Sequence, residues 1–154
     1  MEANRLGLCE TLDNNNKYVI ILLDTNFLIY IARGVIAPSM ILEALDIAYR
    51  LVACRQVLSE LEYLSRSARQ FKVRRLANRA IELLGSLKVC MTDCPGDNAD
   101  DAVLLKALHL AGAGLRVIVA TGDRELRRRL RSHGIPSLYF RESEGILETD
   151  WEVI

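Results

Sequence analysis

Four acidic residues give the sequence its clearest chemical signal, because each stands where a predicted strand ends or a predicted helix begins. They are Asp24, Glu60, Asp101 and Asp123. Hard cations such as Mg²⁺ prefer carboxylate oxygens, and crowded carboxylates repel one another unless a cation neutralises them. A metal ion held in this way can activate water and stabilise charge on a phosphodiester. The four acids therefore indicate metal-dependent phosphodiester chemistry.

Each acid also has a purely structural explanation. Aspartate is a frequent N-cap residue and suits the first turn of a helix, so Asp24, Asp101 and Asp123 could each cap a helix. Glu60 could be a solvated residue on a helix surface. The joint occurrence of these acids at matching strand and helix ends favours a shared site.

Five apolar segments are predicted to be strands, and helical patterns separate them. The segments are 18–23, 51–54, 87–91, 116–120 and 137–141. Continuous apolar runs are typical of strands buried on both faces, and their alternation with helices predicts an α/β fold with a parallel, doubly wound sheet. Ligands bind such sheets beyond the carboxyl ends of the strands. Asp24 and Asp123 follow two of these strands and so lie at the expected place.

The chain length of 154 residues is enough for one domain with a buried core. We interpret residues 1–16 as a polar N-terminal lead-in and residues 17–154 as a single domain. No apolar run approaches the ~20 residues of a membrane span, and the N-terminus lacks a basic stretch followed by an apolar one. These features predict a cytoplasmic protein without a membrane partner.

The charge distribution is more informative than the net charge, which is zero because Lys plus Arg and Asp plus Glu both number 20. Basic residues concentrate in two stretches, 66–79 and 124–131. Arginine makes planar, bidentate contacts with phosphate, so both stretches are candidates for binding nucleic acid. Helical spacing continues from the first stretch through Leu84, and the alternative is that both stretches are solvated helix faces.

The four cysteines do not form a recognisable zinc pattern. Cys90 and Cys94 are close in sequence, but they have neither a second cysteine pair nor a histidine nearby. Cys54 and Cys90 lie in apolar, strand-like surroundings and are expected to be buried thiols. A disulfide between Cys90 and Cys94 stays open at this point.

The sequence resembles the PIN-domain ribonucleases at four segments, which occur in the order typical of that family. The segments are ILLDTNFLI at 21–29, VLSEL at 57–61, ADDAVL at 99–104 and VIVATGDREL at 117–126. Any one of these motifs is weak evidence, but the four together cover about residues 18–141. The family resemblance therefore gives the chemical signal of the four acids a structural context.

The resemblance implies a three-layer α/β/α fold with a parallel five-stranded sheet in the order 3-2-1-4-5. It also implies an endoribonuclease that uses Mg²⁺ or Mn²⁺ bound by the four acids. In the third motif, Asp101 matches the family pattern better than Asp100, so Asp101 is expected to be the ligand and Asp100 a helper. Three polar residues match positions that orient ligands, namely Thr25, Asn26 and Thr121. Four arginines are predicted to contact RNA, namely Arg74, Arg75, Arg127 and Arg128.

Within the family, the protein could process ribosomal RNA or could be a VapC-type toxin that an antitoxin protein neutralises. The Asp100–Asp101 pair and the basic stretch at 124–129 favour the processing role. A non-catalytic RNA-binding or assembly module is a further alternative, although all four acids are present. A nucleotide-binding or receiver-like domain is disfavoured because a glycine-rich phosphate loop is missing.

The resemblance also implies a homodimer. Four apolar residues could form the contact between subunits or could instead pack in the core: Phe27, Ile31, Ile36 and Met40.

Overall fold

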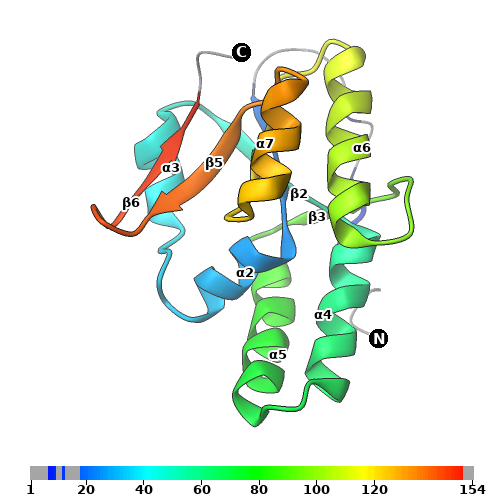
Figure 1. The fold of residues 1–154 in the computed structure, drawn as a ribbon, viewed down its shortest axis with the longest axis vertical. Helices are drawn as coiled ribbons and strands as arrows, with labels where there is room; N and C mark the ends of the chain where they lie inside the picture. The colour runs from blue at the N-terminus through cyan, green and yellow to red at the C-terminus, as the bar shows by residue number, and fades with distance from the viewer. Residues whose placement is uncertain (1–6, 10–11, 13–17, 151–154) are drawn as a thin grey trace.

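The structure is a computed structural model that describes residues 7–9, 12 and 18–150. Its centre is a six-stranded sheet in the order β3-β2-β1-β4-β5-β6, which Figure 1 shows with helices packed around it. The strands are β1 (Val19–Leu23), β2 (Tyr49–Cys54), β3 (Cys90–Thr92), β4 (Val117–Ala120), β5 (Ser137–Arg141) and β6 (Ile146–Thr149). The predicted order 3-2-1-4-5 and the α/β/α class are confirmed, and β6 adds an antiparallel strand beside β5.

Strand β1 lies at the centre of the sheet because it is apolar along its whole length, and all of its residues are buried. It pairs in parallel with β2 on one side and with β4 on the other. In this register Leu23 lies opposite Ala120, and the backbone N–H of Asp24 donates to the carbonyl of Ala120 at 3.0 Å. The residues that follow β1 and β4 therefore meet at the same edge of the sheet.

Six helices connect the strands: α2 (Thr25–Ala32), α3 (Ser39–Leu45), α4 (Arg55–Ser67), α5 (Phe71–Ser86), α6 (Ala99–Gly112) and α7 (Arg124–Ser132). Figure 1 shows α6 and α7 side by side, and α4 and α5 as a hairpin that extends away from the sheet. Helices α2, α4, α6 and α7 all begin just beyond the carboxyl ends of strands. Their first turns therefore surround the edge at which β1 and β4 end.

The first arginine-rich stretch does not form one continuous helix. Helix α4 ends at Ser67, Ala68 is extended, and α5 begins at Phe71. One terminal nitrogen of Arg74 donates to the carbonyl oxygens of Ala68 and Arg69, at 2.6 and 3.2 Å. The stretch therefore spans the end of one helix, a turn and the start of the next.

Apolar residues of α2 and of the segment that follows it pack into the core. Phe27, Ile31 and Ile36 are buried, and Met40 is partly buried against the same core. For the three buried residues the structure therefore shows core packing, which was the alternative to a contact between subunits. A homodimer, if it forms, requires another surface.

All four cysteines form disulfides, which pair Cys9 with Cys90 and Cys54 with Cys94. The expectation of buried thiols at Cys54 and Cys90 is therefore wrong, and Cys90 does not pair with Cys94. The physical reason is the position of neighbouring strands. Residues 7–9 pair with β3, which brings Cys9 to Cys90, and β2 lies beside β3, which brings the end of β2 close to Cys94.

Much of the expected polar lead-in, residues 1–6, 10–11 and 13–16, lies outside the described residues, as do residue 17 and residues 151–154 at the C-terminus. The described residues 7–9 run in parallel beside β3. In the described part of the chain, no helix has the length and apolar character needed to cross a membrane.

Candidate active site

Asp24 stands at the centre of the candidate site, directly after β1 and at the N-cap of α2. Its side chain is buried, with 2% of the residue exposed. One carboxylate oxygen accepts from the backbone N–H of Thr25 at 2.9 Å, and the other accepts from the hydroxyl of Thr121 at 2.7 Å. Asp24 therefore caps a helix, as the structural explanation expected, and also presents a carboxyl group at the meeting point of β1 and β4.

Burial raises the pKa of Asp24 to about 6, although the two hydrogen bonds from Thr121 and Thr25 oppose the shift. The negative charges of Asp100 and Glu60 add to the increase. No positively charged side chain is among the groups that shift the pKa of Asp24. The pKa therefore shows that the acids act on one another electrostatically.

Two threonines connect the acids through hydrogen bonds. The hydroxyl of Thr121 donates to Asp24 and accepts from the backbone N–H of Asp123 at 3.1 Å. The hydroxyl of Thr25 donates to Glu60 at 3.2 Å. Thr25 and Thr121 are thus placed to orient carboxylates. Asn26 is exposed, and its side chain has no hydrogen bond to any described residue.

Glu60 reaches the site from the second turn of α4. The residue is exposed, yet the protein atoms around its carboxyl partly desolvate it, which raises its pKa. The hydrogen bond from Thr25 opposes this increase, and the charge of Asp100 adds to it. Glu60 therefore belongs to the same electrostatic group as Asp24.

Asp100, in the first turn of α6, is the acid that interacts with most of the others. Partial desolvation raises its pKa, and the charges of Asp123 and Asp101 raise it further, while Arg129 lowers it. Its own charge raises the pKa values of Asp24 and Glu60. Asp100 is therefore close enough to the other acids to interact with them electrostatically.

Asp101 has different neighbours. Its backbone N–H donates to the side chain of Asn98 at 2.9 Å, and its carboxylate accepts from the amide of Asn98 at 3.1 Å. It also lies 3.7 Å from Arg129 on α7. Adjacent residues on a helix point in directions about 100° apart, so the two acids have different surroundings. These contacts do not support the expectation that Asp101 ranks ahead of Asp100.

Asp123 is the N-cap of α7. One of its carboxylate oxygens accepts from the backbone N–H groups of Glu125 and Leu126, at 2.9 and 3.1 Å. Its charge also contributes to the raised pKa of Asp100. Asp123 therefore caps α7 and also interacts electrostatically with another acid of the site.

The chemistry of the acids fits a hard divalent cation. Across residues 7–9, 12 and 18–150, no three His, Cys, Asp or Glu side chains stand close enough together, in their present rotamers, to hold one metal ion. The candidate donors are nevertheless all carboxylate oxygens, and desolvation and neighbouring negative charges raise the pKa values of Asp24, Glu60 and Asp100. A bound Mg²⁺ or Mn²⁺ would relieve both.

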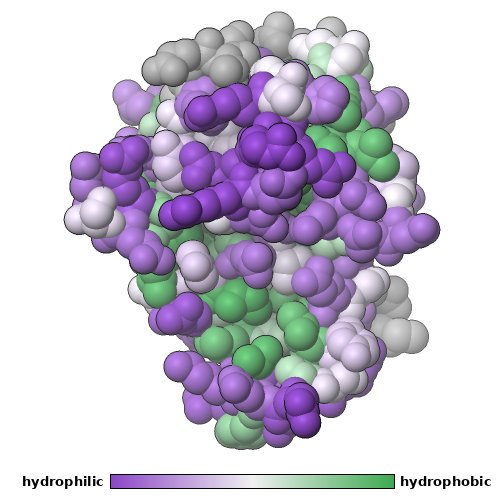
Figure 2. All heavy atoms as spheres, in the orientation of Figure 1, coloured by the Kyte–Doolittle hydropathy of each residue, from purple (hydrophilic) through white to green (hydrophobic). Residues whose placement is uncertain are grey.

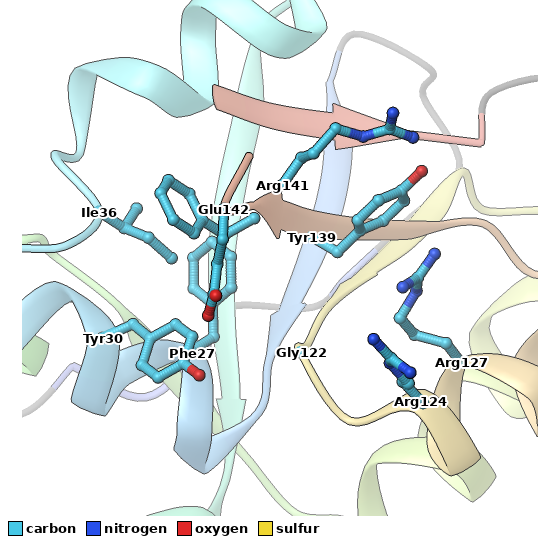
Figure 3. A pocket seen from close by; sticks show the side chains of 10 residues that line it. Phe27, Tyr30, Ile36, Gly122, Arg124, Arg127, Tyr139, Arg141 and Glu142 are labelled. Atoms are coloured by element: carbon cyan, nitrogen blue, oxygen red, sulfur yellow. The ribbon is translucent and has the colours of Figure 1, made fainter. Parts of the chain in front are cut away.

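A cavity of about 430 Å³ lies beside the acids and was not anticipated from the sequence. Gly122 and Arg124, on either side of Asp123, line it together with residues of α2, α7 and β5. Figure 3 shows Tyr30 on one side of this cavity and Arg124 and Arg127 on the other. Among its lining residues, Arg127 was predicted from the sequence to contact RNA, and Arg124 belongs to the same basic stretch.

The four arginines predicted to contact RNA lie in different environments. Arg127 lines the cavity, and its guanidinium lies 3.5 Å from the ring centroid of Tyr139. Arg128 is exposed and pairs with Glu125 one turn earlier. Arg74 and Arg75 both lie over the ring of Phe71 in α5. Figure 2 shows strongly hydrophilic surface where α7 lies.

Comparisons with known proteins agree with this architecture. The sequence profile of the PIN-like domain family matches residues 21–143. The chain is 32% identical to ribonuclease VapC4 of Methanocaldococcus jannaschii over 123 residues, which cover 79% of this chain and 89% of that protein. It is 29% identical to ribonuclease VapC9 of Archaeoglobus fulgidus over 147 residues, which cover 95% and 96% of the two chains.

A solved structure shares the fold. The PIN-domain endonuclease Utp24 superposes with a TM-score of 0.66 over 85% of this chain and 90% of that one, at 20% sequence identity. The segments matched by the family profile contain all four motif acids. The chain therefore belongs to the PIN-like domain family.

Proposed function

We propose that this protein is an endoribonuclease that hydrolyses RNA phosphodiester bonds with a divalent metal ion. The observation that carries the proposal is a group of four acids that includes the buried Asp24. The four acids come from four separate segments of the chain. They are Asp24, Glu60, Asp100 and Asp123. Relatives that bear the name ribonuclease support the same reaction.

These four carboxylates would hold Mg²⁺ or Mn²⁺, and Asp101 is the weaker candidate because Asn98 and Arg129 already engage it. The bound ion would supply positive charge for the phosphate and lower the pKa of a water molecule. The chain itself orients the ligands, since Thr121 fixes Asp24 and Thr25 fixes Glu60. Asp24 ionises fully only above pH 6, so metal binding should strengthen as the pH rises through that value.

Two cellular roles are compatible with this reaction, and they rest on different kinds of support. A VapC-type toxin, neutralised by an antitoxin protein, is favoured by the two VapC ribonucleases, because their similarity spans most of each chain. A role in ribosomal RNA processing rests on the sequence pattern at Asp100–Asp101 and 124–129, since the likeness to Utp24 extends to the fold alone. An antitoxin partner and a homodimer stay predictions.

The decisive experiment compares purified variants on mixed structured RNAs with Mn²⁺ and with EDTA. Asp24→Asn and Asp100→Asn should each lower the cleavage rate by ~10²-fold or more, because each removes electrostatic stabilisation in the site. Asp101→Asn should cost less, and Glu43→Gln on α3, whose side chain is exposed, serves as the control. Folding is checked by circular dichroism.

Full activity in folded Asp24→Asn would contradict the proposed site. RNA binding without cleavage in the unmodified protein would instead support the non-catalytic module considered from the sequence.

A further inference from the structure

The cavity beside Asp123 has two unlike walls. Tyr30, Phe27 and Phe140 contribute aromatic rings to its lining, and Figure 3 shows Phe27 and Tyr30 together on the side formed by α2. The guanidinium of Arg33 lies over the Tyr30 ring, 5.7 Å from its centroid, and the partly buried ring also lines the cavity, where it can meet a ligand. Aromatic rings at this exposure are suited to stack with a planar, apolar group.

The opposite wall is cationic. Arg124 and Arg127 enter it from α7, as Figure 3 shows, and neither forms an ion pair with any described acid. Arg127 is held in place by the ring of Tyr139, whose hydroxyl donates to Glu148 at 3.2 Å. The Nε of Arg127 is buried and lacks a hydrogen-bond partner among the described residues. A fixed guanidinium without a counter-charge is suited to bind an anion.

The position of the cavity connects it to the acids. Gly122 lines the cavity and Asp123 follows directly, so the backbone that ends at the acidic group also forms the cavity floor. Helix α2 contributes Asp24 at its N-cap and Tyr30 at its last turns. A chain whose phosphate reached the acids could therefore place its adjacent residue in the cavity. The volume of about 430 Å³ is typical of small-ligand sites.

We propose that this cavity binds one nucleotide of single-stranded RNA, next to the phosphate at the acidic group. The base stacks on Tyr30, and the nucleotide's own phosphate contacts Arg124 and Arg127. Single-stranded RNA is recognised in this way because its unstacked bases are free to stack on aromatic side chains. The inference rests on the proposed function and names its substrate class as unpaired RNA.

Glu142 gives the cavity a base preference. It is the one acid in the lining, and Figure 3 shows it on the side of Phe27 and Tyr30, away from Arg124 and Arg127. A carboxylate accepts hydrogen bonds and cannot donate them when ionised. Guanine presents two adjacent N–H donors on its Watson–Crick edge, whereas uracil presents one. Adenine and cytosine present a single amino group on this edge beside a ring nitrogen that only accepts, so guanine alone can donate from two adjacent groups to one carboxylate and is the preferred base.

The test measures the binding of labelled pentanucleotides by fluorescence anisotropy in EDTA, where cleavage is suppressed. The probes are UUGUU, UUAUU, UUCUU and UUUUU. Tyr30→Leu should weaken binding of UUGUU by about 5-fold to 100-fold, the range of one lost base stack. Arg124→Gln should weaken it and should reduce the slope of log affinity against log salt by about 0.7. Glu142→Gln should remove the preference for UUGUU.

Matched controls lie outside the cavity and outside both arginine-rich stretches. Tyr63→Leu removes an exposed tyrosine of α4, and Lys88→Gln removes an exposed lysine between α5 and β3. Both should leave affinity and salt slope unchanged. Thermal unfolding identifies variants that fail to fold. If Tyr30→Leu does not fold, Arg124→Gln still tests the inference, because Arg124 is exposed and its replacement should not disturb the core.

The outcomes separate this inference from the proposed function. If the protein binds UUGUU through the cavity but does not cleave RNA with Mn²⁺, the inference stands and the nuclease proposal fails. If it cleaves RNA while Tyr30→Leu and Arg124→Gln bind and cleave as the unmodified protein does, the inference is overturned. Absence of measurable pentanucleotide binding overturns it as well.

Discussion

The two flanks of the candidate site are built differently. On the β2–β3 side, the Cys54–Cys94 disulfide joins the residue before α4 to the loop before α6, and these helices carry Glu60 and Asp100. The side chain of Gln56 reinforces the link by donating to the carbonyl oxygens of Cys94 and Gly96, at 2.9 and 2.8 Å. This flank holds together acids whose charges repel.

On the β4–β5 side, the described residues contain no disulfide, and the cavity opens between α2, α7 and β5. Arg124 and Arg127 face this space without an acidic partner. The two flanks therefore have different functions. The crosslinked flank keeps the repelling acids in place, and the open flank leaves room for a substrate strand.

The largest expected effect comes from removing the crosslink. The Cys54–Cys94 disulfide closes a loop with a sequence separation of 40, so replacing both cysteines by serine should lower the free energy of unfolding by about 4 kcal/mol. The increase in melting temperature caused by Mn²⁺ should shrink too, because Glu60 and Asp100 are less firmly held. Denaturant titration and thermal unfolding measure the two effects.

Serine at Cys9 and Cys90 is the matched control for that prediction. It removes a disulfide of sequence separation 81, away from the acids, and should lower stability without changing the response to Mn²⁺. Equal Mn²⁺ responses in both double variants would show that the crosslink does not serve the site.

The next effect concerns Asp24, which lies between the two flanks. Its pKa is raised from 3.8 to about 6, so the unfolded chain releases this proton before the folded chain does. The metal-free protein should therefore lose up to about 3 kcal/mol of stability as the pH rises from 4 to above 6. Asp24→Asn should remove this loss and be the more stable protein at pH 7.5.

Denaturant unfolding in EDTA across this pH range tests the prediction, with Glu43→Gln as the control. The advantage of Asp24→Asn should vanish as the pH falls below 3.8, where the carboxyl becomes protonated in both states. A constant difference at every pH would mean that burial does not destabilise the charged carboxylate.

A smaller effect distinguishes the two arginine-rich stretches. Neutralising Arg127 and Arg128 on α7 should weaken RNA binding and lower the salt slope by about 0.7 for each lost phosphate contact. Neutralising Arg74 and Arg75 should change both less, because Arg74 already donates to two backbone carbonyl oxygens and both residues lie on the hairpin that extends away from the sheet. RNA affinity across a salt series decides the matter, and equal slopes for the two double variants would contradict the comparison.

The smallest effect concerns the first arginine-rich stretch, where we expect Arg74 to contribute to the stability of the fold. Arg74→Gln should lower the free energy of unfolding by about 1 kcal/mol, because the carbonyl oxygens of Ala68 and Arg69 lose their donor. Arg75→Gln is the matched control, since its side chain also lies over Phe71 but makes neither hydrogen bond. Urea titration of both variants measures the difference, and equal stabilities would show that the turn does not depend on Arg74.

The sequence alone determined which segments form parallel strands and which segments carry the acids, and the family resemblance implied the strand order. The apolar run at 18–23 was expected to be buried on both faces, and a parallel sheet brings the residues after its strands to one edge. Asp24 and Asp123 were therefore placed correctly at that edge. The threonines 25 and 121 were also identified from motif position, and the structure gives both of them acidic partners.

Only the tertiary structure decided how side chains from distant segments meet. It gave Asp100 and Asp101 different neighbours: the charge of Asp100 contributes to the raised pKa of Asp24, whereas Asn98 and Arg129 contact Asp101. It paired each cysteine with a partner on a neighbouring strand or loop, and it formed the cavity between α2, α7 and β5. Local patterns in a sequence specify which elements form, whereas these contacts depend on the rotation and spacing of elements that lie far apart in the chain.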